Sequence, residues 1–76
     1  MFEVRISYPF DSDFAQRDEE LIRLAGRRYN HSGANVSGCD GAERDLIFDV
    51  ATFEEATAIR SGIESTGEYQ ATIRER

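Results

Sequence analysis

Apolar residues recur along this chain with two periods, and the period changes five times within 76 residues. An apolar residue at every second position is typical of a strand with one buried face. Apolar residues at helical spacing indicate an amphipathic helix. The order of expected elements is strand, helix, strand, strand, helix, strand. The expected strands cover residues 2–8, 34–38, 44–51 and 69–74, and the expected helices cover 13–29 and 53–66.

The expected helices begin and end at residues with known capping preferences. Thr52 and Glu55 form a T-x-x-E capping box, a strong signal for a helix start. Asp13 with Gln16 has the same spacing at the start of the first helix. Gly67 is placed to close the second helix in the left-handed conformation. The starts of both helices and the end of the second are therefore marked in the sequence.

The order of elements predicts an α+β fold, a ferredoxin-like βαββαβ sandwich formed by one domain over residues 1–76. Two β-α-β halves with right-handed crossovers give an antiparallel four-stranded sheet in order 4-1-3-2. Both helices then cover one face of the sheet, over the apolar strand residues such as Leu46, Phe48 and Val50. The other face is open and mostly polar. Its expected residues are Glu3, Arg5, Ser7, Asn35, Ser37, Asp45, Ile47, Asp49, Gln70, Thr72 and Arg74.

The open face does not match a nucleic-acid-binding sheet. The RNA-recognition motif stacks bases on aromatic residues of its two central strands, within a positively charged surrounding. The corresponding positions here are Glu3, Arg5, Asp45, Ile47 and Asp49. Because these positions include three carboxylates and no aromatic ring, we expect no direct binding of nucleic acid.

Enzymatic activity and cofactors are not expected either. Cys39 and His31 could act as nucleophile and base if the fold brought them together. No third orienting group is evident, and a turn cysteine with a solvated histidine explains the same residues. The residues from Asp11 to Asp13 fit helix capping better than a cation site. The loop after the first strand lacks the cysteine pair that soft metals require.

Charge gives the one functional lead. The chain has fifteen acidic and nine basic residues, a formal net charge of −6, and every basic residue is arginine. An acidic surface favours basic partners, whereas a net charge of about this size also keeps a small domain in solution. Eleven of the acids fall within residues 11–20 and 40–55. If the surface is functional, the expected partner-binding residues are Asp40, Glu43, Asp45, Asp49, Glu54 and Glu55.

One resemblance supports that lead. In the stretch Arg44–Val50, in its continuation into Thr52–Ala56, and in its compact length, the chain resembles the small acidic ferredoxin-like proteins of phages and mobile elements, some of which are anti-CRISPR proteins. The resemblance implies a stoichiometric inhibitor that occupies a basic nucleic-acid-binding surface of a partner complex. It carries no functional residue over to this chain.

A second interpretation is an assembly or regulatory module. Such a module forms a homodimer or pairs with another protein through its open sheet face or an edge strand. Ile47, an apolar residue among polar neighbours on that face, favours burial at a contact. The two interpretations differ in salt dependence, because acidic mimicry weakens as ionic strength rises and apolar sheet pairing does not.

The sequence also predicts a cytoplasmic location. The single Cys39 cannot form an internal disulfide, which is compatible with a reducing compartment. No apolar run approaches the roughly 20 residues that span a bilayer. The first residues do not resemble a signal peptide, because charged and polar residues interrupt them.

Overall fold

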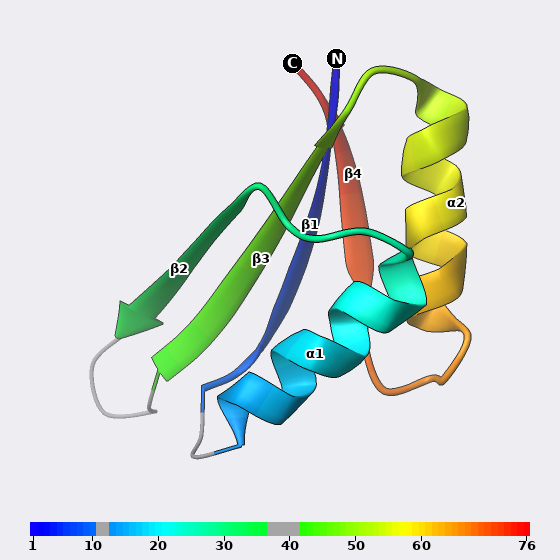
Figure 1. The fold of residues 1–76 in the computed structure, drawn as a ribbon. Coiled ribbons are helices and arrows are strands. Elements are labelled where there is room, and N and C mark those ends of the chain that lie inside the picture. Colours follow the sequence, from blue (N-terminus) through cyan, green and yellow to red (C-terminus); the bar gives the residue numbers. More distant parts are fainter. Residues whose placement is uncertain (11–12, 37–41) are drawn as a thin grey trace.

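The computed structural model describes residues 1–10, 13–36 and 42–76, and it arranges them as one sheet and two helices (Figure 1). The chain is α+β, in the predicted element order. The elements are β1 (Phe2–Pro9), α1 (Phe14–Ala25), β2 (His31–Val36), β3 (Ala42–Val50), α2 (Phe53–Glu64) and β4 (Ala71–Glu75).

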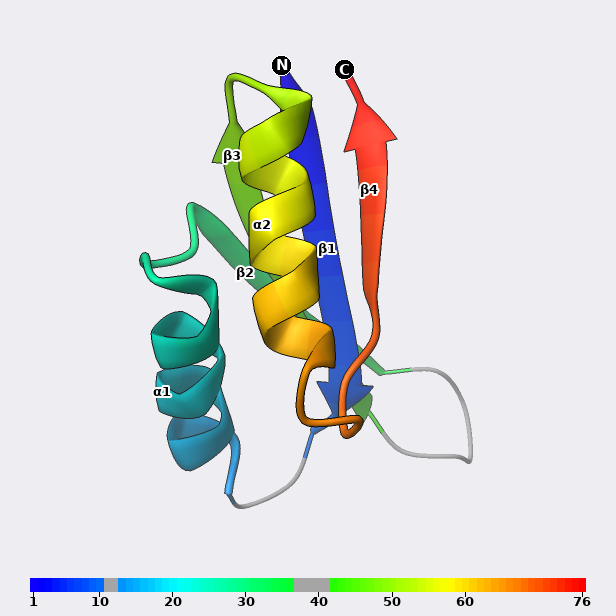
Figure 2. The same ribbon diagram turned by 90° about the vertical axis from the view of Figure 1, so that its right-hand side faces the viewer.

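The four strands form one antiparallel sheet in the order β2-β3-β1-β4, so β1 and β3 are central. Counted from the β4 edge, the strands follow one another as 4-1-3-2. Both helices lie on the same side of the sheet, and α2 runs along β1 (Figure 2). This arrangement is consistent with a ferredoxin-like sandwich.

The core lies between the sheet and the helices. Phe48 of β3 is fully buried, and the strand alternation predicted for β1 and β3 is confirmed. Burial of such side chains is the main favourable contribution to folding. The buried apolar residues are Val4, Ile6, Tyr8, Leu21, Leu46, Phe48, Val50, Ala56, Ile59, Ile63, Tyr69 and Ala71.

Helix α1 is four residues shorter at its end than predicted. It stops at Ala25 because Gly26 adopts a left-handed conformation, with φ at 77°, and donates its N–H to the Ile22 carbonyl at 2.9 Å. Gly26 therefore ends the helix instead of lying inside it. The predicted capping box at the other end is also wrong, because the Asp13 side chain makes no capping hydrogen bond.

Helix α2 begins as predicted. The Thr52 hydroxyl accepts a hydrogen bond from the Glu55 backbone N–H at 3.2 Å, which confirms the N-cap. Gly62 then faces α1 so closely that a Cβ atom there would lie 2.3 Å from the Leu24 carbonyl oxygen. The absence of a side chain at Gly62 thus permits the close approach of the two helices.

Strand β2 differs most from the prediction. It covers His31–Val36 instead of residues 34–38, and His31 to Ala34 are exposed. Ala34, expected to point into the core, is exposed because β2 lies at the edge of the sheet away from the helices (Figure 1). The turn predicted at residues 39–41 falls outside the described residues.

We expect Phe48→Ala to lower the free energy of unfolding by about 3–5 kcal/mol, since it leaves a cavity in the middle of the core. Chemical denaturation measures this change. Phe53→Ala is the matched control, because Phe53 is 57% exposed and its loss removes little buried area. Equal effects of the two substitutions would show that β3 does not present Phe48 to the helices.

Candidate functional site

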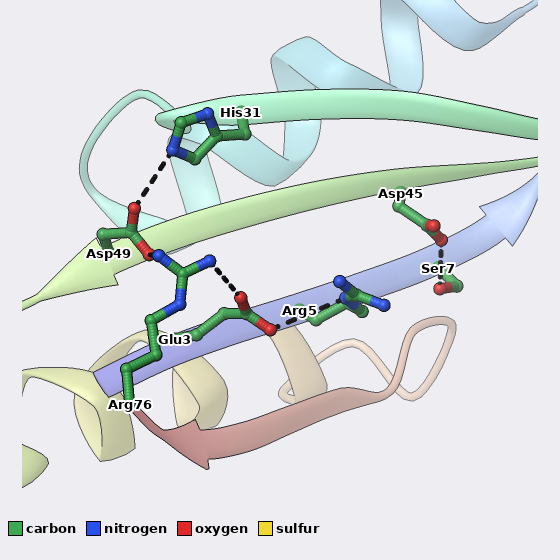
Figure 3. A network of polar contacts seen from close by, with 7 residues as sticks. All are labelled: Glu3, Arg5, Ser7, His31, Asp45, Asp49 and Arg76. Atoms are coloured by element: carbon green, nitrogen blue, oxygen red, sulfur yellow. Dashed lines mark hydrogen bonds and ion pairs between the residues drawn. The ribbon is translucent and has the colours of Figure 1, made fainter. Parts of the chain in front are cut away.

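The open face of the sheet carries most of the predicted partner-binding residues that the structure describes. The side chains drawn in Figure 3 come from β1, β2 and β3 and from Arg76, which follows β4. Among them, Glu3 and Asp49 lie opposite one another on β1 and β3. Ser7 and Asp45 form the next such polar pair along the same two strands. The contacts on this face form two groups, the Ser7–Asp45 pair and a chain of ion pairs that includes Glu3 and Asp49.

Glu3 is the most buried group of this face, with only 4% of the residue exposed. The Arg76 Nη2 atom donates to the Glu3 Oε1 atom at 2.6 Å, and the Arg5 Nε atom lies 3.7 Å from Oε2 (Figure 3). The sequence predicted Glu3 to be open to water. It is shielded because the long arginine side chains cover its carboxylate while staying half exposed themselves.

Asp49 is held from two sides. Its Oδ1 atom lies 3.4 Å from Arg76 Nη1, and its Oδ2 atom lies 3.2 Å from His31 Nε2 (Figure 3). Its backbone N–H donates to the Asn30 side chain at 2.9 Å. Arg76 follows β4 in the chain, and its side chain contacts Glu3 of β1 and Asp49 of β3. One side chain therefore links the end of β4 to both central strands.

Asp45 and Ile47 complete the open face of β3. The Asp45 carboxylate accepts a hydrogen bond from the Ser7 hydroxyl. Ile47 lies between the two aspartates, opposite Arg5 on β1 and His31 on β2, and is partly exposed. An apolar side chain thus lies at the centre of a polar and ionic surface.

The six predicted partner-binding residues do not form one patch. Asp45, Asp49 and the exposed Glu43 lie on β3, whereas Glu54 and Glu55 begin α2 in the helix layer. Glu55 is engaged there: its carboxylate lies 3.1 Å from the Arg27 Nη2 atom. Asp40 falls outside the described residues.

The charges of the open face nearly cancel. Within the described strands and Arg76, which follows β4, the face carries four acids and three arginines, together with His31. The chain as a whole has a formal charge of −6, so most of its excess acid lies elsewhere. The four acids of the open face are Glu3, Glu43, Asp45 and Asp49, and its three arginines are Arg5, Arg74 and Arg76.

The sequence prediction of the face omitted His31 and Arg76. A signal for Arg76 was present, because the alternation of Gln70, Thr72 and Arg74 places residue 76 on the same face when continued by one step. No such signal existed for His31, since β2 begins three residues before its predicted start.

A second polar cluster holds α1 to the sheet. Asp18, only 7% exposed, accepts hydrogen bonds from the Tyr8 hydroxyl and from Arg44, whose Nη2 atom lies 2.7 Å from Oδ2. Burial, and then the Asp18 carboxylate, raise the pKa of Tyr8 above its ordinary value. The hydrogen bonds to Asp18 likewise raise the pKa of Arg44. The Arg44 guanidinium also stacks on the Phe14 ring at 5.3 Å.

One of the two residues considered for catalysis lies within the described part of the chain. His31 pairs with Asp49 on the exposed face, and Cys39 lies outside the described residues, so their proposed pairing is not tested. A hollow of about 220 Å³ lies between the start of α1 and Tyr69, below the roughly 300 Å³ typical of ligand pockets. No group of three potential metal ligands occurs among the residues described.

Within the same residues, no helix has the length and apolar character needed to cross a membrane.

No protein-family model and no curated protein sequence matches this chain. The arguments about its function therefore rest on its own geometry.

We expect Arg76→Gln to lower the free energy of unfolding by about 2 kcal/mol, because it leaves the shielded Glu3 carboxylate without its closest donor. Arg74→Gln is the matched control, since Arg74 is exposed on the same face and should change stability by less than about 0.5 kcal/mol. Urea denaturation measures both. If the two variants are equally stable, the Arg76 contacts do not hold in solution.

We expect Asp18→Asn to cost about 3 kcal/mol, because the change leaves the Arg44 cation at a largely buried position without its counter-charge. The control is Glu19→Gln, the next residue of α1, which is exposed and should have little effect. Thermal and urea unfolding report the difference. A stability equal to that of the control would mean that Arg44 turns out to solvent.

Proposed function

We propose that the protein is a non-enzymatic assembly module that pairs with another protein chain through the open face of its sheet. The observation that carries this proposal is the position of the Arg76 guanidinium between Glu3 and Asp49. It gives Glu3 and Asp49, two of the four acids of this face, a shared counter-charge, so these two carboxylates are already paired before a partner binds.

Compensated charge suits a surface that is covered by a second chain. Burying an isolated charge costs several kcal/mol, whereas a charge already paired and hydrogen-bonded loses less when water is removed. The side chains of the network also stand on paired strands, so they lose little freedom on binding. A partner of mixed polarity therefore fits this face better than a strongly basic one.

Ile47 gives the face an apolar centre. Protein interfaces commonly have an apolar core within a polar rim, and the core supplies most of the binding energy. On this face the rim consists of the groups around Ile47, which include Arg5, His31, Asp45 and Asp49. The partner is expected to place an apolar side chain over Ile47 and hydrogen-bonding groups over its surroundings.

The second candidate function is a stoichiometric inhibitor of the anti-CRISPR type, which occupies a basic nucleic-acid-binding surface of a partner complex. The observation in its favour is that Glu43 and Glu54 are exposed, with no ion pair within the described residues. They lie on different layers of the fold, one on β3 and one on α2. The compensation of Asp49 favours the assembly module over this inhibitor.

We expect Ile47→Arg to abolish capture of the partner in a pull-down from the source cells, because it places a charge at the centre of the contact. Ala58→Arg is the matched control: it adds the same charge on the exposed side of α2 and should leave capture unchanged. Mass spectrometry identifies the captured protein, and circular dichroism verifies that both variants fold.

Salt separates the two candidates in the same experiment. Capture by the assembly module should persist from about 50 to 200 mM salt, the range over which phosphate-like contacts weaken strongly. The inhibitor would replace the assembly module if three results occur together. Capture would be lost over this salt range, would survive Ile47→Arg, and would disappear when Glu43→Lys and Glu54→Lys are combined.

A further inference from the structure

We propose that the free edge of β2 docks against β2 of a second copy of this chain, so that two four-stranded sheets join into one continuous antiparallel sheet. This contact is made by the edge of the sheet and is separate from the open face. It therefore does not depend on the proposed function.

The direction of the backbone groups identifies what β2 presents. Phe10 donates its N–H to the Ala42 carbonyl at 2.8 Å, so the even-numbered residues of β3 direct their N–H and C=O groups toward β1. The odd-numbered residues of β3 consequently direct their N–H and C=O groups toward β2. Their partners there are His31, Gly33 and Asn35. The intervening residues of β2 direct their N–H and C=O groups to the free edge. These residues are Ser32, Ala34 and Val36.

The other edge of the sheet is better protected. Arg76 donates its N–H to the Met1 carbonyl at 2.9 Å, so Ala71, Ile73 and Glu75 direct their backbone groups away from β1. The Ala71 N–H is already used, because it donates to the Glu64 carboxylate at 3.1 Å. Charged side chains and short length, both found in β4, are known protections of an edge strand.

Strand β2 is about as short as β4 but lacks its charged side chains. Its exposed residues are small from Ser32 to Ala34, and His31 is its one ionisable side chain. It contains no proline, lysine or carboxylate. Figure 1 shows it at the margin of the sheet away from both helices, so neither helix obstructs a strand laid beside it.

Charge and symmetry point to a second copy as the occupant. Each copy has a formal charge of −6, so most surfaces of two copies repel each other, whereas two β2 strands bring no acids together. A two-fold axis through Ala34 places Ala34 opposite itself and Ser32 opposite Val36 of the second copy. In this register every outward N–H and C=O of the three residues gains a partner.

The size of the contact sets its strength. A six-residue strand pair buries less than the roughly 1,200 Å² at which stable interfaces begin. The dimer is therefore reversible, and its population rises with protein concentration. Sedimentation equilibrium of the purified chain, without any partner, is the appropriate measurement.

We expect Ala34→Pro to weaken dimerisation at least tenfold. Proline removes an outward N–H and leaves the hydrogen bonds between β2 and β3 in place. Glu75→Pro, which removes an outward N–H from the β4 edge, is the matched control and should dimerise like the parent. Ala34→Lys provides a second variant should proline disturb the strand, because it places two like charges on the two-fold axis.

Cross-linking tests the register. Directly opposed residues of a hydrogen-bonded antiparallel pair lie about 5.5 Å apart at Cα, within the range that a disulfide spans. With Cys39→Ser as background, Ala34→Cys should therefore form a covalent dimer under mild oxidation, and Glu75→Cys should not. The proposal is overturned if the parent chain is monomeric at all concentrations. It is also overturned if a dimer survives both Ala34→Pro and Ala34→Lys and does not cross-link through Ala34→Cys. In the latter case, loss of the dimer with Ile47→Arg would assign it to the open face.

Discussion

A single buried carboxylate determines how α1 meets the sheet. Asp18 of α1 is bound at once by Tyr8 of β1 and Arg44 of β3, the two central strands. A carboxylate removed from water is tolerated only where donors satisfy it, so α1 has one favourable position along the sheet. With α1 in that position, Leu21 packs in the core and the helix contacts Gly62 of α2.

The elements that the sequence predicted well are those with strong local signals. The strict alternation around Phe48 locates β3, and the Thr52 capping box locates the start of α2. The end of the first helix was predicted four residues too late, because the sequence alone does not distinguish a glycine inside a helix from one that ends it. The left-handed backbone of Gly26 makes that distinction. Strand β2 was misplaced because His31 to Ala34 have no hydrophobic alternation, and their pairing with β3 alone makes them a strand.

The candidate site shows the same division between local and distant information. Alternation placed Asp45 and Asp49 on the open face as observed, because the side-chain period of a strand needs no tertiary knowledge. The groups that compensate Asp49 come from other strands, Arg76 after β4 and His31 in β2. Whether a carboxylate is available to a partner depends on such distant contacts, which composition cannot supply. The acidic character of the sequence therefore overstated the acidity of this face.

The unequal edges of the sheet limit how many copies can add to it. Growth of a sheet into a filament requires two adhesive edges, since each added copy must leave a new edge for the next. Here Glu64 occupies the first outward N–H of β4, and charged side chains follow it along the strand. Edge-to-edge association would therefore close after one addition. A small acidic domain can in this way keep one edge available and still avoid amyloid-like polymerisation.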